Sequence, residues 1–226
     1  MRTRALTIGA VAVIVTIGLF RSCTATSTSD ESAVPTTSPS ATASGDIGPS
    51  RIVDGVPRGW RHDQAGARAA ALSAVSLTGE IARAGFITRG DMIRALASAQ
   101  FGPTLATESA TQLADVFGEI TAAGVAPSAV LFHELVLTAR VVRADTLSAV
   151  VDVWSVLVAG LPDSGAPRQA WRTVTVTVVW ESDDWRIDGW DAQAGPTPAL
   201  ASNAAISTVD DVATVIAWPS ADNGGS

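Results

Sequence analysis

The hydrophobic pattern of the chain changes its period once, near residue 130, and this change constrains the fold more than any other feature. Before it, apolar residues recur three and four positions apart, the spacing of one helix face; after it, they alternate every second position, the spacing of a strand. Helices followed by consecutive strands with short connections predict an α+β domain with an antiparallel sheet.

Three helices are predicted before the change. The first begins at Asp63, a residue that can cap it, and runs to about Ala84 with a narrow, alanine-rich apolar stripe. The second begins with the T-x-x-D capping box of Thr88 and Asp91, with Ile87 and Met92 placed as a hydrophobic staple. The sequence FGP at 101–103 ends it, and the third helix is predicted from Leu105 to Ala123.

Four strands are predicted after the change. They cover Val130–Arg143, Thr146–Ala159, Trp171–Trp180 and Trp185–Trp190. The predicted domain is therefore three helices packed on a curled four-stranded antiparallel sheet. A further short helix is predicted to begin at Thr208.

The N-terminus carries an export signal. Arg2 and Arg4 precede an uncharged run from Ala5 to Phe20, and Arg21 follows it. Its 16 residues span roughly 24 Å as a helix, slightly less than a hydrocarbon core of about 30 Å. A cleavable signal peptide and a signal anchor both fit; we favour the anchor because no A-x-A cleavage sequence follows. Both interpretations place the rest of the chain outside the cytoplasm.

The chain divides by composition into five parts. A cytoplasmic tail (1–4) precedes the transmembrane signal anchor (5–21), and a Ser/Thr/Pro-rich stalk (22–50) follows, which we expect to be disordered because it has nothing to bury. The extracytoplasmic α+β domain is predicted over 51–194, with a C-terminal extension over 195–226.

Charge and cysteine content limit the function classes. Beyond Arg21 the chain has 12 arginines against all 22 acidic residues, and it has no lysine, so we expect no nucleic-acid partner. The single cysteine, Cys23, cannot form an internal disulfide, and Arg21 and Ser22 before it disfavour lipidation.

Two polar residues are candidates for a ligand cavity. Asp152 interrupts an apolar strand, where it points into the domain, pairs with an arginine such as Arg140 or Arg172, or faces solvent. His133 shares the alternation of the apolar residues of its strand, which fits a hydrogen-bonded core histidine better than a base. Its neighbour Glu134 is expected to point to the opposite face, so the two cannot form a simple dyad. Two histidines so far apart predict no metal site, and no cofactor motif is present.

The tryptophans gather in the predicted sheet and the tail. Trp180 and Trp185 flank the ESDD turn and are expected to pair across the strands. Trp171 and Trp190, at the sheet ends, and Trp218 in the tail are candidates for an interaction surface, with core packing as the alternative for the sheet residues and docking on the domain for Trp218.

Two stretches carry a family resemblance: GVPRGWRHDQAGARAAALS (55–73) and WRTVTVTVVWESDDWRIDGW followed by GPTPAL (171–200). They resemble membrane-anchored proteins of actinobacterial integrative and conjugative elements. The predicted domain is similar to the cone of the ketosteroid-isomerase-like (nuclear-transport-factor-2-like) fold. A short inner tail, one anchor and such a domain resemble the inner-membrane scaffold subunit of type IV secretion machines, and also the proteins associated with Mce lipid importers.

This resemblance implies a scaffold or binding component of a conjugation or type-IV-like transfer apparatus, acting through protein contacts and homo-oligomerisation. The alternative is a lipid- or small-molecule-binding accessory protein of the cell envelope. Some relatives of the cone are enzymes that use an Asp base and a Tyr donor. This chain has no tyrosine, and we expect no enzymatic activity.

Overall fold

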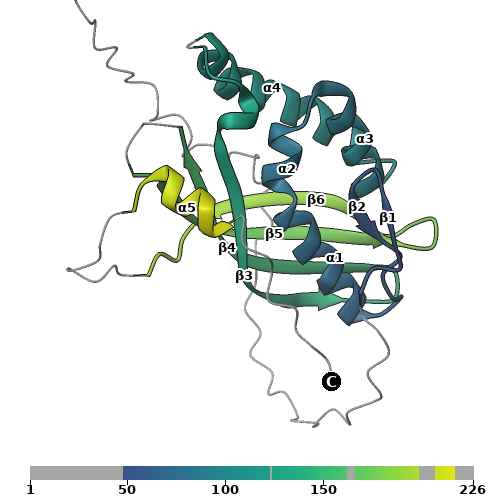
Figure 1. Ribbon diagram of the computed structural model, residues 1–226. Coiled ribbons are helices and arrows are strands. Elements are labelled where there is room, and N and C mark those ends of the chain that lie inside the picture. Colours follow the sequence, from purple (N-terminus) through teal and green to yellow (C-terminus); the bar gives the residue numbers. More distant parts are fainter. Residues whose placement is uncertain (1–47, 123, 162–165, 199–206, 217–226) are drawn as a thin grey trace, which may run out of the picture.

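A computed structural model describes residues 48–122, 124–161, 166–198 and 207–216 of the chain. Within these ranges the protein is an α+β domain, as the change of period predicts. Helices pack on one face of a four-stranded antiparallel sheet, which stays open (Figure 1).

The sheet follows the chain order, because short connections join neighbouring antiparallel strands. Its order is β3-β4-β5-β6, so β3 and β6 are the edges. All four predicted strands are confirmed with small extensions: β3 (Leu131–Ala144), β4 (Ser148–Gly160), β5 (Arg168–Trp180) and β6 (Trp185–Ala194). Trp180 and Trp185 form the predicted cross-strand pair, with ring centroids 5.4 Å apart.

The helix layer has four members rather than three: α1 (Gln64–Ser76), α2 (Thr78–Arg83), α3 (Phe86–Leu96) and α4 (Gly102–Ala122). Asp63 caps α1 as predicted by accepting from the Gly66 amide. The predicted first helix is interrupted at Leu77. At this point the Ser76 and Thr78 hydroxyls donate to backbone carbonyls three residues earlier, a type of bond that bends helices.

The inner face of the sheet and the alanine stripe of α1 form the main core. Ala67, Ala71 and Ala74 are buried against valines of β4 and β5. Because alanine is small, the helix axis can lie close to the strands, and the β-branched valines fill the pleated surface.

The second predicted helix begins two residues earlier than expected. Gly85 is the N-cap of α3, with no side-chain cap, so the predicted capping box at Thr88 is wrong. The predicted staple is also wrong, because Ile87 is 78% exposed while Met92 is buried in the core. Pro103 does not separate two elements either; it lies in the first turn of α4, where a missing amide hydrogen costs nothing.

Strand β3 inverts the expected alternation. Glu134 is buried on the helix side, whereas Leu135 is 38% exposed. The ladder with β4 shifts between Val136 and Thr138, and again between Val141 and Arg143. Each bulge inserts one residue, so Ala139 and Val141 still turn inward toward the core.

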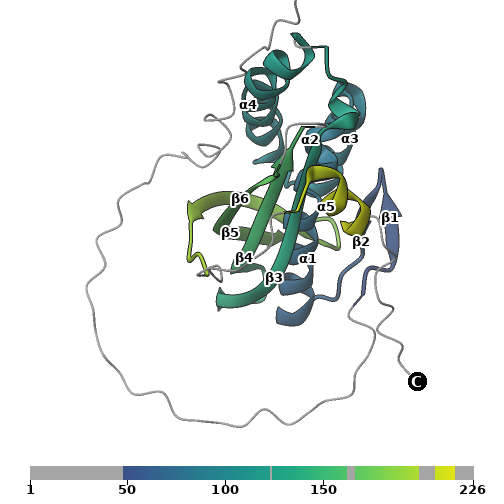
Figure 2. The same cartoon turned by 60° about the vertical axis from the view of Figure 1, so that its left-hand side comes forward.

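Two smaller elements complete the domain. The segment before α1 is a hairpin of β1 (Arg51–Val53) and β2 (Val56–Arg58). The short helix α5 (Val209–Ile216) lies on the side of the sheet opposite α1 and α2, where Val209 packs with Leu131, Val156 and Val158 (Figure 2).

Within the described ranges no helix is both long and apolar enough to cross a bilayer. The predicted tail (1–4), the anchor (5–21), nearly all of the stalk and Trp218 lie outside these ranges.

Candidate functional site

A buried ion pair lies on the inner face of the sheet. Arg172 of β5 donates from Nε to Oε1 of Glu134 over 2.8 Å, and from Nη2 to Oε2 of the same carboxylate. Ser155 of β4, between them, donates to Oε1 over 2.6 Å. The Glu134 side chain is fully buried and that of Arg172 is 10% exposed. Because the guanidinium donates to both carboxylate oxygens, neither oxygen of this buried carboxylate is left without a hydrogen bond.

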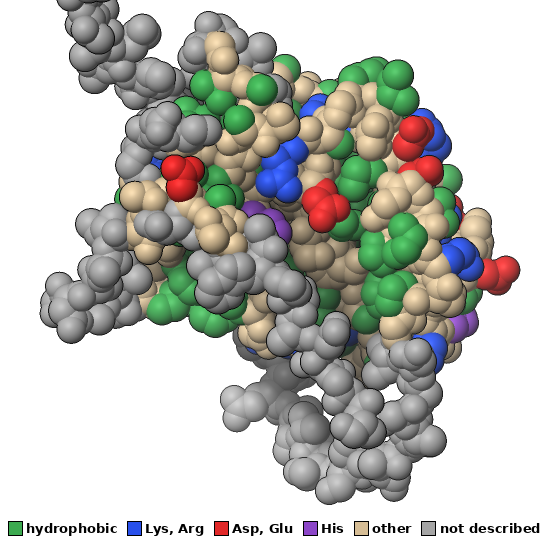
Figure 3. Space-filling view, viewed as in Figure 1, with side chains coloured by type: hydrophobic (Ala, Val, Ile, Leu, Met, Phe, Trp, Pro, Cys, Tyr) green, Lys and Arg blue, Asp and Glu red, His purple; other side chains and the backbone are tan. Residues whose placement is uncertain are grey.

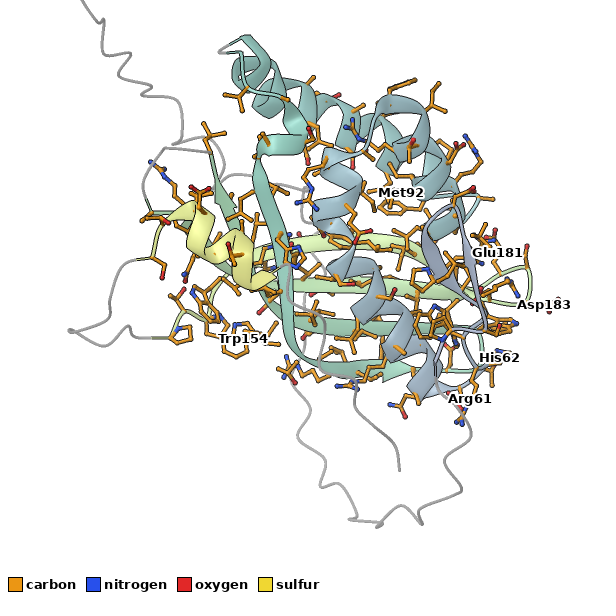
Figure 4. All side chains as sticks on the ribbon, in the orientation of Figure 1. Arg61, His62, Met92, Trp154, Glu181 and Asp183 are labelled. Carbon is orange, nitrogen blue, oxygen red and sulfur yellow. The ribbon has the colours of Figure 1, made fainter. Side chains whose placement is uncertain are left out.

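A cavity of about 120 Å³ opens beside this pair, between the helices and the sheet. Its walls are almost entirely apolar and come from α1 to α4, with Phe132 of β3 and Trp190 of β6 below them. Arg172 is the one charged side chain in the lining. Figure 4 shows the neighbouring Met92 in the same layer between helices and sheet. The cavity therefore combines apolar walls with one fixed cation at its floor.

The guanidinium of Arg172 retains a donor for a further group. Nε and Nη2 are used by Glu134, and within the described part of the chain Nη1 has no hydrogen-bond partner. Arg172 lines the cavity, so this donor belongs to a side chain that a ligand there would contact. A carbonyl, hydroxyl or carboxylate entering the cavity could accept from it.

The two predicted cavity residues lie elsewhere. Asp152 takes the arginine alternative: Arg140 donates to it from Nε and Nη2 over 3.0 and 2.8 Å, and Thr175 donates over 2.8 Å. His133 is half-buried and pairs across the ladder with Val158, which belongs to the cluster on the α5 side. Burial, with the nearby charge of Arg83, lowers the pKa of His133 and favours its neutral form.

The predicted surface tryptophans are both half-buried. Trp171 packs in the cluster beneath α5, with its ring centroid 5.3 Å from that of Trp154. Trp154 in turn donates to the Pro196 carbonyl and lies near α5, far from Met92 (Figure 4). Trp190 contacts the main core and lines the cavity. Their role in an interaction surface stays a prediction.

Sequence reasoning missed the ion pair because it assigned Glu134 to the outer face of its strand. One signal could have found it: Glu134 and Arg172 are opposite charges in strands that flank β4, and the residues two positions before and after each of them are apolar. Within the described ranges, no three His, Cys, Asp or Glu side chains are grouped as metal ligands.

Comparisons with known proteins place the chain in no family. No family model matches it, and no curated protein matches it. The intermembrane space region of chloroplast protein ARC6 is a similar solved structure, with 16% identity and a TM-score of 0.39. That match covers 60% of this chain and 99% of the chloroplast chain.

Proposed function

We propose that the chain is a non-enzymatic, membrane-anchored protein whose extracytoplasmic domain binds a small, mostly apolar molecule. The observation that carries this proposal is the apolar cavity with the Arg172 guanidinium at its floor. It corresponds to the second function expected from the sequence, a lipid- or small-molecule-binding protein of the actinobacterial envelope. The finer fold assignment, a cone of the ketosteroid-isomerase-like type, belongs to the same proposal.

The buried charge supports a binding role over a purely structural one. A buried ion pair is often no more stabilising than apolar residues of the same volume. Glu134 and Ser155 hold Arg172 in place while one of its donors stays available to the cavity. A ligand with an apolar body and one acceptor or anionic group would bury its body against the apolar walls and accept a hydrogen bond from that donor.

The cavity volume limits the ligand. About 120 Å³ is close to the roughly 150 Å³ that holds a benzene ring, and is below the roughly 300 Å³ of a drug-sized pocket. A single ring or a short chain fits it. A long acyl chain would require α4 to move away from the sheet.

The test uses hexanoate and hexanol as probes of equal chain length, with and without the anion. We expect saturable binding of both by the full-length protein, with hexanoate binding about tenfold more tightly because of Arg172. The fluorescence of Trp190 should report it, and Trp190→Phe should remove most of the change.

Two sets of variants separate the cavity from the ion pair. Ser109→Leu adds a side chain to the cavity wall on α4 and should abolish binding, whereas Thr111→Leu, on the exposed side of α4, should not. The double variant Glu134→Leu with Arg172→Leu leaves no unpaired charge and should erase the preference for hexanoate. Absence of saturable binding to the parent protein would overturn the proposal.

A second candidate is the scaffold role in a conjugation or type-IV-like apparatus. It is favoured by Phe86 and Ile87 at the start of α3, which are 80% and 78% exposed. Large apolar side chains reach the surface over the helices in Figure 3, and such residues are common anchors in protein interfaces. The other partner expectations, membrane contact and homo-oligomerisation, belong to this candidate.

Crosslinking in cells followed by a pull-down of C-terminally tagged full-length protein tests the second candidate. Recovery of transfer ATPases with the parent chain, and their loss with Phe86→Ser and Ile87→Ser, would support it. Recovery of lipid-transport proteins instead would favour the first candidate.

A further inference from the structure

A cleft separate from the apolar cavity gathers four arginines. Arg51 of β1, Arg58 of β2, Arg94 of α3 and Arg186 of β6 line a space of about 220 Å³, with Asp54 as the one acidic residue in the lining. These are four of the 12 arginines that follow Arg21, in a chain whose net charge is −7. These four positive charges are therefore concentrated around one cleft of a chain that is acidic as a whole.

The four arginines share few acceptors. Arg51 lies 3.5 Å from the Asp184 carboxylate, and Nη1 of Arg186 donates to the Arg94 carbonyl over 3.4 Å. Arg58 donates from Nε to Asp184 over 2.7 Å, while Nη1 of Arg58 and Nη1 of Arg186 both donate to the carbonyl of Ala95. Two guanidinium groups thus converge on one neutral oxygen. Among the residues that the structure describes, Nε of Arg186 is buried without any hydrogen-bond partner. A buried donor in this state destabilises the protein unless a ligand or water accepts from it.

Three of the surrounding carboxylates are already engaged. Asp184, beneath the cleft, also accepts from the amides of Gly59 and Trp60, and Asp91 is paired with Arg94 over 2.7 Å. Glu181 accepts from the Ala99 amide, and Asp54 lies exposed at the rim. Burial and the neighbouring Arg58 lower the pKa of Arg186, while the carboxylates of Asp184 and Glu181 act in the opposite direction.

We propose that this cleft binds a phosphate group, held by the guanidinium groups of Arg186, Arg58 and Arg94. A tetrahedral oxyanion offers several acceptors at once and matches the planar fork of arginine. The volume is sufficient for the phosphate and part of an attached group. The phosphate could belong to a free phosphorylated molecule or to a phospholipid headgroup, and the experiment separates these sources.

Titration calorimetry on the full-length protein in phosphatidylcholine nanodiscs tests the proposal. The probes are inorganic phosphate, pyrophosphate and glycerophosphoglycerol, which is the headgroup of phosphatidylglycerol without its chains. We expect saturable binding that weakens as salt rises. Tighter binding of pyrophosphate identifies a free phosphorylated ligand, and tighter binding of glycerophosphoglycerol identifies a lipid headgroup.

Arginine variants locate the binding. Arg186→Gln should raise the dissociation constant of the tightest-binding probe by about tenfold or more, which is the contribution of one charge-assisted contact. Because Arg186 is partly buried, Arg94→Gln gives a second test at a side chain that is 75% exposed. Arg143→Gln makes the same charge change on exposed β3 and is the matched control.

The proposal is overturned if none of the three probes binds saturably. It is also overturned if Arg143→Gln weakens binding as much as Arg94→Gln does, because the effect would then come from net charge alone. Neither result depends on the apolar cavity, so the two proposals can fail independently.

Discussion

Asp184 is the residue on which one end of the domain depends. It is fully buried, and its carboxylate joins the β5–β6 turn to Arg58, Gly59 and Trp60 after the β1–β2 hairpin. Segments more than 120 positions apart in sequence meet through this one side chain.

The stability of the protein should therefore fall in acid. Burial raises the pKa of Asp184, but the amide of Gly59 and the guanidinium of Arg58 outweigh it, so the folded pKa lies below the ordinary value of 3.8. The stabilisation from this group is complete above the unfolded pKa and is lost as pH falls through the lowered folded pKa. Urea unfolding between pH 6 and pH 2 should show this loss.

Asp184→Asn is the variant that isolates the effect. It should lower the free energy of unfolding at pH 7 by about 2–4 kcal/mol, because Arg58 stays buried without its charge partner. It should also flatten the acid dependence. Parallel pH profiles for Asp184→Asn and the parent protein would contradict the assignment.

Single residues also mark the limit of sequence reasoning. Asp184 and Glu134 stand in turn-like and alternating contexts where a charged side chain is usually solvated, and only distant partners make them buried. The alternation of β3 misplaced His133 and Glu134 because two bulges, at Val136/Thr138 and Val141/Arg143, reset which positions face the core. The spacing of apolar residues in the sequence does not show where such bulges occur.

At the scale of elements, the period of apolar residues was sufficient for the helices and strands but not for their ends. The four strands and the start of α1 follow from alternation and from Asp63. The interruption at Leu77 and the start of α3 at Phe86 do not, since Thr88 and Asp91, the expected cap, lie inside α3. The helix between these two points, α2, packs against β3.

Gly79 of α2 and Gly90 of α3 make a matched pair for testing this packing. A Cβ at Gly79 would lie 2.3 Å from the Phe132 carbonyl oxygen, whereas at Gly90 the nearest atom is 3.9 Å away. Gly79→Ala should destabilise the protein by about 1–3 kcal/mol by forcing α2 away from β3. Gly90→Ala should stabilise it by about 0.5–1 kcal/mol through helix propensity.

Chemical denaturation of both variants gives the comparison. Equal effects of the two substitutions would show that α2 does not approach β3 closely enough for a methyl group at position 79 to clash. The opposite signs expected here come from the same chemical change in two helices, so no difference in residue type can explain them.

At the scale of the whole molecule, the apolar cavity and the arginine cleft occupy different parts of one domain. The cavity lies between α4 and the inner sheet face, and the cleft lies by the β1–β2 hairpin at the start of the domain. Composition predicted a domain outside the membrane but neither site, because both are formed by residues from opposite ends of the domain sequence.

The predicted anchor can be tested on the full-length chain in an actinobacterial host. We expect the protein to stay with membranes after carbonate extraction and its intact mass to include residues 1–21, as a signal anchor requires. In spheroplasts, external protease should remove a C-terminal tag and spare a tag placed before Met1.

Val13→Asp puts a charge in the middle of the apolar run, at a cost of about 2.5–3.5 kcal/mol, and should reduce membrane retention. Thr37→Asp in the stalk is the matched control. A mature protein that lacks residues 1–21 would instead establish the cleavable signal peptide, and any phospholipid bound at the arginine cleft would then have to be captured by a protein without an anchor.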